Sequence, residues 1–346
     1  MVLKLSKKYL LAVVCVVLLG FVCVLALPGL ISPPGTSAEN LFAGGRLCAQ
    51  ASEPDGSVRT VSEEEDTDER FRRPSKALPY PNPYSFKDFE KANDEEPLIT
   101  KKFEDPEDLI LAYYGILREA SNMVGYWGGC GTVGWSRLPY PYAYELLTDG
   151  AQETMTLEAF ENSFAGTGYT TLLKLYPAYA PPETPAGTKY YMVELETVTG
   201  EKMDPDRGAS EGSGFAYHYG LITAEEDPDE GFKIAAVDYI PEDFLCAPLH
   251  GWSYLAEAVV EIVYGNNLKL IDRIDRVEHK GGLIDVYASG GGKSYRFEFV
   301  RLTNGYDILL HEYVSENGAW RETSLLTDDW KNLKLSPENS RLRASE

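Results

Sequence analysis

A glycine-rich stretch, GYWGGCGTVGW at Gly125–Trp135, is the first place where residue types and spacing could do chemistry. Gly129–Gly134 has the G-x-G-x-x-G spacing of dinucleotide-binding loops, and Cys130 within it could act as a nucleophile. A dinucleotide loop needs a strand before it and a helix after it. Here a helical pattern precedes the stretch and SRLPYPY follows it. We therefore interpret it as a structural loop whose Trp127 and Trp135 pack on the domain, with a nucleophilic Cys130 as the alternative.

His218, in FAYHYG, is the most interesting single candidate for acid–base chemistry. On a strand it shares a face with Ala216 and Gly220, whose small size leaves room for a pocket. A hairpin loop of three or five residues would place Asp238 opposite His218, whereas a loop of four residues would place Tyr239 there. A His–Asp pair could act as a general base. The alternative, which we prefer, is a strand histidine hydrogen-bonded to a neighbouring tyrosine.

Two other stretches resemble known motifs, but each lacks a residue that its motif requires. In GGGKS at Gly290–Ser294, Tyr287 stands where a phosphate-binding loop needs its first glycine. In HEYVS at His311–Ser315, Ser315 stands where H-E-x-x-H needs its second histidine. Histidines, cysteines and carboxylates are not grouped at metal-ligand spacing, so we expect no metal and no cofactor.

The cysteines fall into two groups. Cys15 and Cys23 lie in an apolar run near the N-terminus, which leaves Cys48, Cys130 and Cys246, an odd number. We expect a structural Cys130–Cys246 disulfide with Cys48 free. Three unpaired thiols are the alternative, because spacing alone does not decide the pairing.

Helical signals begin at Asp105, which suits an N-cap and is followed by Pro106 at the first helical position. Apolar residues recur at helical spacing after it, and we expect Gly125 to stop this helix. Two further helices are predicted, one at Tyr142–Gly150 and one that starts at Thr156.

The pattern then changes to runs rich in Tyr, Val, Ile and Thr, separated by Pro, Gly and Asp turns. Strands joined this closely should form an antiparallel meander. Their predicted bounds are Tyr169–Tyr179, Thr188–Val198, Gly214–Glu226 and Gly231–Ile240. A shorter version of this order follows, with a helix at Gly251–Gly265 and further strands between Leu268 and Val314. Helices followed by meanders indicate an α+β fold.

This order of elements, with its short T-L-E-x-F helix and Tyr-rich strands, resembles the NTF2-like superfamily of cone-shaped α+β domains over about Asp105–His250. The resemblance implies helices packed on a curved antiparallel sheet that enclose a pocket. The segment 251–326 would be a second, smaller helix-and-meander module. Some members of the superfamily are isomerases or dehydratases, while many exported bacterial members are binding modules with no chemistry. The candidates for the pocket lining are Trp127, Tyr217, His218, Asp238 and Tyr239.

The N-terminus carries Lys4, Lys7 and Lys8, followed by an uncharged apolar run at Tyr9–Ile31. The run is long enough for a transmembrane helix. Lysines on its near side alone predict a cytoplasmic N-terminus and an extracellular remainder. We expect residues 1–31 to be a single-pass signal anchor in the lipid bilayer of the cell membrane; a cleaved signal peptide is the alternative.

The rest of the chain is acidic. Residues 32–104 are rich in Pro, Gly, Ser and acid, which predicts a disordered linker, and 327–346 reads as a polar, frayed tail. The formal net charge of −22 argues against nucleic acid as a partner, since both carry the same sign.

A tether, two sheets and no evident catalytic constellation together predict a class of function. We expect a membrane-tethered, non-catalytic binding or accessory module of a bacterial cell envelope. Its partner would be an envelope protein, a peptide or a wall fragment. The alternatives are an exported enzyme with isomerase or dehydratase chemistry that uses His218 as its base, and an inhibitor of an envelope hydrolase.

Overall fold

The structure is a computed structural model, and it describes residues 41–48, 83–91, 102–127, 136–203, 214–244 and 251–339. The predicted membrane anchor at 1–31 lies outside these residues, as do Cys130 and Cys246. Within the described ranges, no helix has both the length and the apolar character needed to cross a bilayer.

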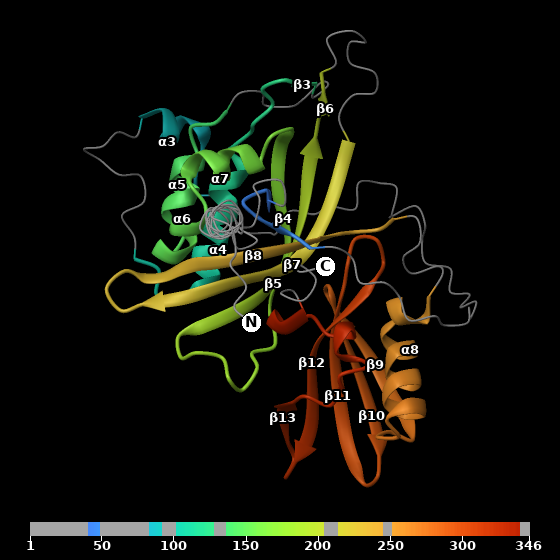
Figure 1. The fold of residues 1–346 in the computed structure, drawn as a ribbon. Coiled ribbons are helices and arrows are strands. Elements are labelled where there is room, and N and C mark those ends of the chain that lie inside the picture. Colours follow the sequence, from blue (N-terminus) through green and yellow to red (C-terminus); the bar gives the residue numbers. More distant parts are fainter. Residues whose placement is uncertain are drawn as a thin grey trace, which may run out of the picture. The chain divides into compact units, whose positions relative to one another are not determined.

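Four long antiparallel strands form the centre of the first sheet (Figure 1). They are β4 (Thr167–Pro177), β5 (Thr188–Thr199), β7 (Gly214–Asp227) and β8 (Gly231–Pro241). Each pairs with the next in the chain, so the predicted meander is confirmed. A separate two-stranded sheet joins β3 (Tyr126–Trp127) to β6 (Glu201–Lys202).

Short helices cover one face of this sheet (Figure 1). They are α4 (Pro106–Arg118), α5 (Tyr140–Glu145), α6 (Asp149–Thr154) and α7 (Leu157–Ser163). The predicted caps are present, because Asp105 accepts a hydrogen bond from the Glu107 N–H and Thr156 accepts one from the Ala159 N–H. Helix α4 ends before Gly125, because the Asn122 backbone N–H bonds to a strand residue instead of continuing the helix.

Part of the predicted linker belongs to the sheet. Strands β1 (Leu41–Phe42) and β2 (Gly45–Leu47) form a tight hairpin, and β2 pairs in parallel with β8 at the edge of the sheet. Helix α3 (Phe86–Lys91) adds a buried Phe89 to the core. Phe103, which is 6% exposed, also joins the core and bridges to Gly231. The prediction of disorder across 32–104 is therefore wrong for these three pieces, because all carry apolar side chains that the domain buries.

A second sheet of five antiparallel strands follows in the chain. It contains β9 (Arg273–Lys280), β10 (Leu283–Gly290), β11 (Lys293–Arg301), β12 (Asp307–Glu316) and β13 (Ala319–Thr323). Helix α8 (Ala256–Val259), which continues as a π-helix at Val260–Asn267, packs on one face. The sequence predicted the helix and the first four strands but not β13.

The predicted polar tail is also ordered in its first part. A 3-10 turn at Lys331–Leu333 leads into Leu335, which is 5% exposed, and Asn339, which is 2% exposed. The segment packs because Leu335 joins a hydrophobic cluster and Asn339 donates to backbone carbonyls. The prediction of a frayed tail is wrong for residues 327–339.

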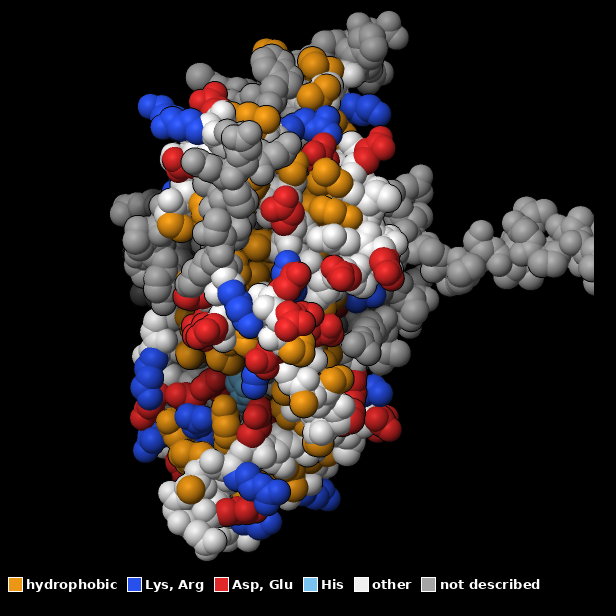
Figure 2. Space-filling model, turned by 90° about the vertical axis from the view of Figure 1, so that its left-hand side faces the viewer, with side chains coloured by type: hydrophobic (Ala, Val, Ile, Leu, Met, Phe, Trp, Pro, Cys, Tyr) orange, Lys and Arg blue, Asp and Glu red, His pale blue; other side chains and the backbone are white. Residues whose placement is uncertain are grey.

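The apolar residues form three clusters in an α+β fold, the predicted class. The first lies between α4–α7 and the inner face of the six-stranded sheet, and the second lies beneath α8. The third combines the outer face of the first sheet, including Met192 and Leu221, with Leu310 of the second sheet. On the face drawn in Figure 2, Asp and Glu side chains gather across the middle of the molecule.

Candidate functional site

The tip of the β1–β2 hairpin reaches the helix layer above the inner face of the sheet. Ala43 and Gly44 form its two-residue turn, with φ angles of 48° and 78°. Two consecutive positive φ values are typical of type I′ turns, which suit tight hairpins. The Ala43 N–H donates to the Ser163 carbonyl at 3.1 Å, and the Gly44 N–H donates to the Ser163 hydroxyl at 2.8 Å. The last residue of α7 therefore holds the turn.

Two glycines allow this close approach. A Cβ on Gly44 would lie 2.6 Å from a ring carbon of Phe160 and 2.7 Å from the Tyr113 hydroxyl. A Cβ on Gly45 would lie 2.6 Å from a ring carbon of Tyr239. Side-chain carbons are not found at such distances, so the cradle accepts only glycine at both positions.

Phe42, beside the turn, stacks on His218. Their ring centroids are 4.2 Å apart and their planes differ by 29°. Burial lowers the pKa of His218 from its ordinary value of 6.5 to about 4, and its Nδ1 has no hydrogen-bond partner. The ring is therefore neutral at pH 7. In this arrangement His218 is a stacking surface for an aromatic side chain.

Tyr239 is the second aromatic residue of the sheet that contacts the Phe42 ring. The two rings meet edge to face with centroids 6.3 Å apart. The Tyr239 hydroxyl shares a buried hydrogen bond of 2.8 Å with the Tyr114 hydroxyl. Burial raises the pKa of both tyrosines well above 10, so both stay protonated. Tyr239 thus adds an aromatic wall and no charge.

An ion pair fixes the far end of the hairpin. The Arg46 Nε donates to Asp238 Oδ1 at 2.7 Å, and Asp238 is only 5% exposed. The backbone continues the contact, since the Cys48 N–H donates to the Tyr239 carbonyl at 2.6 Å. Residues 41–48, named here the 41–48 segment, are thus bound by stacking, backbone hydrogen bonds and one charge pair.

The predicted His218–Asp238 pair does not form. His218 lies opposite Pro241, and Asp238 lies opposite Leu221. The loop between β7 and β8 has three residues between its paired ends, Asp227 and Gly231, but both ends lie one position later in the chain than a His218–Asp238 pair requires. This position of the turn alone would place Ile240 opposite His218, and a bulge at Thr223/Ala224 shifts the register by one more residue. Asp238 consequently points to the outer face of the sheet, where it meets Arg46, while His218 points to the inner face.

The other predicted lining residues are dispersed. Tyr217 lies on the outer face, where its hydroxyl donates to Glu196 at 2.8 Å and its ring contacts Phe244. Trp127 is 49% exposed on the small β3–β6 sheet, so the expectation that it packs on the domain is wrong. Of the predicted set, the structure brings only His218 and Tyr239 together.

Cys48 forms no disulfide with another described residue and is 1% exposed, at the junction between the two sheets. The sequence predicted a free Cys48 in a flexible segment, and the structure instead buries it. Cys130 lies outside the described residues with the rest of the glycine-rich stretch from 128 to 135. Cys246 lies outside them as well, so the Cys130–Cys246 disulfide stays a prediction.

A cluster of acidic side chains on the outer face of the first sheet connects it to the second. Glu194 is fully buried, pairs with Lys174 and accepts the Thr303 N–H at 2.6 Å. Glu242 accepts the Asn304 N–H at 3.1 Å. Burial and the neighbouring Glu194 raise the pKa of Glu242 well above its ordinary value. A proton on the buried Oε1 of Glu242, which otherwise lacks a partner, would satisfy both carboxyl groups.

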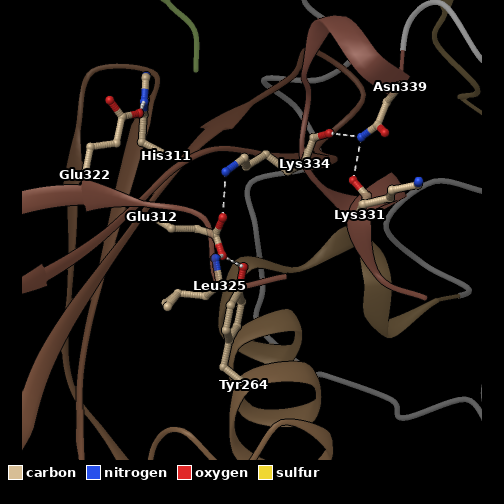
Figure 3. A network of polar contacts seen from close by, with 8 residues as sticks. All are labelled: Tyr264, His311, Glu312, Glu322, Leu325, Lys331, Lys334 and Asn339. Carbon is tan, nitrogen blue, oxygen red and sulfur yellow. Dashed lines mark hydrogen bonds and ion pairs between the residues drawn. The ribbon is translucent and has the colours of Figure 1, made fainter. Parts of the chain in front are cut away.

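A polar network in the second sheet holds the C-terminal segment (Figure 3). Glu312, fully buried, receives the Lys334 ammonium at 2.6 Å, the Tyr264 hydroxyl at 2.8 Å and the Leu325 N–H at 3.1 Å. One carboxylate thus accepts from three groups of different elements, and Asn339 donates to the carbonyls of Lys331 and Lys334 at the 3-10 turn. This network orders the chain and presents no reactive group to solvent.

Sequence reasoning missed Phe42, Gly44, Gly45 and Arg46 because they lie in a stretch assigned to the linker. A signal was present in LFAGGRL, where apolar residues flank a small–Gly–Gly centre as in a hairpin. The two-residue strands are too short for periodicity to identify them.

Comparisons with known proteins do not identify a family for this chain. No family model matches the chain, and no relative was found among curated proteins. A solved structure described as "Ntf2 like protein involved in plasmid conjugation" is similar with 11% identity, over 53% of this chain and 91% of that chain, at a TM-score of 0.19. That superposition is too small to place the chain in a family. In the described part of the chain, no His, Cys, Asp and Glu side chains are grouped to hold a metal ion.

Proposed function

We propose that the chain is a non-catalytic binding module with an NTF2-like domain, held by residues 1–31 at the outer face of a bacterial cell membrane. The observation that carries the proposal is the 41–48 segment bound at the inner face and edge of the first sheet. Stacking on His218, backbone hydrogen bonds to Ser163 and the Arg46–Asp238 pair are the means by which binding modules hold a ligand.

The same geometry weighs against the enzyme alternative. A general base needs a pKa near the working pH and a partner that orients it. Burial lowers the pKa of His218 to about 4, and Phe42 covers its ring. The expected carboxylate partner, Asp238, faces the other side of the sheet and pairs with Arg46.

The test is affinity capture with the full chain in detergent from an envelope fraction, followed by prolonged incubation of the captured component with the chain. We expect the component to be retained and to keep its mass. Conversion of the component into a product, abolished by His218→Ala, would instead place the chain among enzymes. Gly150→Ala is the matched control, because a Cβ there contacts nothing within 4 Å.

A further inference from the structure

We infer that the cradle around the 41–48 segment recognises an extended peptide, in which an aromatic residue is followed by a small residue, two glycines and an arginine. The 41–48 segment is then a tethered copy of the ligand, and the true partner is a peptide segment of another chain with the same pattern. This inference rests on the proposed function as a binding module and names its ligand class.

The edge of β8 provides the backbone half of the recognition. Three separate pieces of chain cover this edge: Phe103 bridges to Gly231, Leu147 bridges to Ile234, and β2 pairs at Asp238 and Tyr239. An exposed sheet edge offers unpaired N–H and C=O groups, which extended peptides complete by adding a strand. The β2 position is such an added strand, held by a parallel ladder of two residue pairs.

The side chains give the sequence preference, position by position. The first position needs an aromatic ring, because it stacks on His218 and meets Tyr239 edge to face. The next positions need a small residue and two glycines, because Ala43 is fully buried and both Gly44 and Gly45 lie against aromatic rings.

The last position needs arginine. Asp238 is 5% exposed and its carboxylate meets both the Nε and a terminal nitrogen of Arg46, at 2.7 and 2.5 Å. A planar guanidinium matches a carboxylate in this way better than an ammonium does. The site therefore selects an arginine four positions after the aromatic residue.

The tether explains why the site is filled by the chain itself. Residues 49–82 separate the segment from the next described part of the chain. A tethered ligand acts at a high effective concentration, so a free peptide of equal intrinsic affinity competes poorly. Weakening the segment without altering the cradle should therefore open the site.

The experiment compares the full chain with its Gly44→Ala variant, in detergent, using a fluorescent peptide of residues 41–48 that carries serine in place of Cys48. A Cβ at position 44 clashes with Phe160 and Tyr113, so the tethered segment should leave the cradle. Release is read from alkylation of Cys48, which is 1% exposed when the segment is bound. Cys48 alkylation is quantified by mass spectrometry and folding by circular dichroism, with Gly150→Ala as control.

We expect Cys48 to react about tenfold faster or more in Gly44→Ala, and the peptide to bind this variant about tenfold more tightly than the native chain. A peptide with Arg46→Glu should bind poorly, and Asp238→Arg in the Gly44→Ala chain should restore its binding. Should Gly44→Ala lose its fold, Phe42→Ala with Arg46→Ala opens the same cradle without touching it.

Two results would overturn the inference. One is a Gly44→Ala chain that is folded and exposes Cys48 but does not bind the peptide. The other is continued protection of Cys48, which would contradict the contacts that define the cradle. Failure here with successful capture of an envelope component would reject the peptide pattern alone and leave the proposed function intact.

Discussion

Two histidines, one in each sheet, are equally buried, but their pKa values are shifted in opposite directions. His218 and His311 are both 7% exposed. His218 stacks on Phe42, and burial lowers its pKa to about 4. His311 is equally desolvated, yet its pKa is raised above the ordinary value of 6.5.

The difference comes from what faces the ring nitrogens. Burial by itself lowers the pKa of His311 too, but Glu322 lies 2.5 Å from its Nδ1 and the Pro177 carbonyl lies 3.0 Å from its Nε2. Acceptors at both nitrogens favour the doubly protonated, charged ring, and this raises the pKa of His311. The cradle around His218 is therefore held together by packing, while the region around His311 depends on charge.

Removing a buried charge near the second sheet should have the largest effect on the free energy of unfolding. Lys334→Ala leaves the fully buried Glu312 carboxylate without its ion-pair partner, which should lower the free energy of unfolding by about 3–5 kcal/mol. Lys331→Ala, which removes an exposed pair with Asp328, should cost less than about 0.5 kcal/mol. Urea denaturation measures both, and equal losses would show that the buried charge is not essential.

The second-largest effect on stability should come from acid, through protonation of His218. The pKa of His218 is about 4 when folded and 6.5 when unfolded, so the unfolded chain binds more protons between these values. Stability from His218 is present above pH 6.5 and falls as the pH drops to 4, by about 3 kcal/mol in total. His218→Phe should remove this part of the slope in urea denaturation from pH 4 to 7. An unchanged slope would show that the ring is not desolvated.

Arg46→Ala should have a smaller effect than either. The variant leaves Asp238 without its guanidinium, but Arg46 is 31% exposed and water can reach part of the pair. We expect a loss of about 1–2 kcal/mol in the free energy of unfolding. The control is Arg321→Ala, whose exposed pair with Glu316 should contribute almost nothing. If both variants lose the same free energy of unfolding, the Arg46–Asp238 ion pair does not hold the hairpin.

The smallest effect on stability is expected at Glu322, which is 40% exposed in its side chain. Glu322→Gln replaces the anion beside His311, so the pKa of His311 should fall. The charged His311 contributes stability below pH 6.5, and this contribution is lost as the pH rises through the raised pKa. In Glu322→Gln this contribution should be smaller. An NMR titration of the imidazole measures the pKa, and Glu316→Gln should leave it unchanged.

Local patterns predicted much of the fold. Asp105 and Thr156 were recognised as N-caps from residue type and position, and alternation located β4, β5, β7 and β8. Strand alternation also placed His218 on a face with small neighbours. It did not place Asp238, because the β7–β8 turn lies one residue later than a His218–Asp238 pair requires and a bulge then moves the register by one more residue. Register is a property of two strands together.

The sequence by itself determined the α+β class, because helical and strand periodicities and their turns are written in neighbouring residues. Only the tertiary structure decided that the 41–48 segment is part of the site. Its strands are two and three residues long, and no local preference holds them in place. They are stabilised by Ser163, His218 and Asp238, which lie more than a hundred positions away and come together only when helices and sheet have packed.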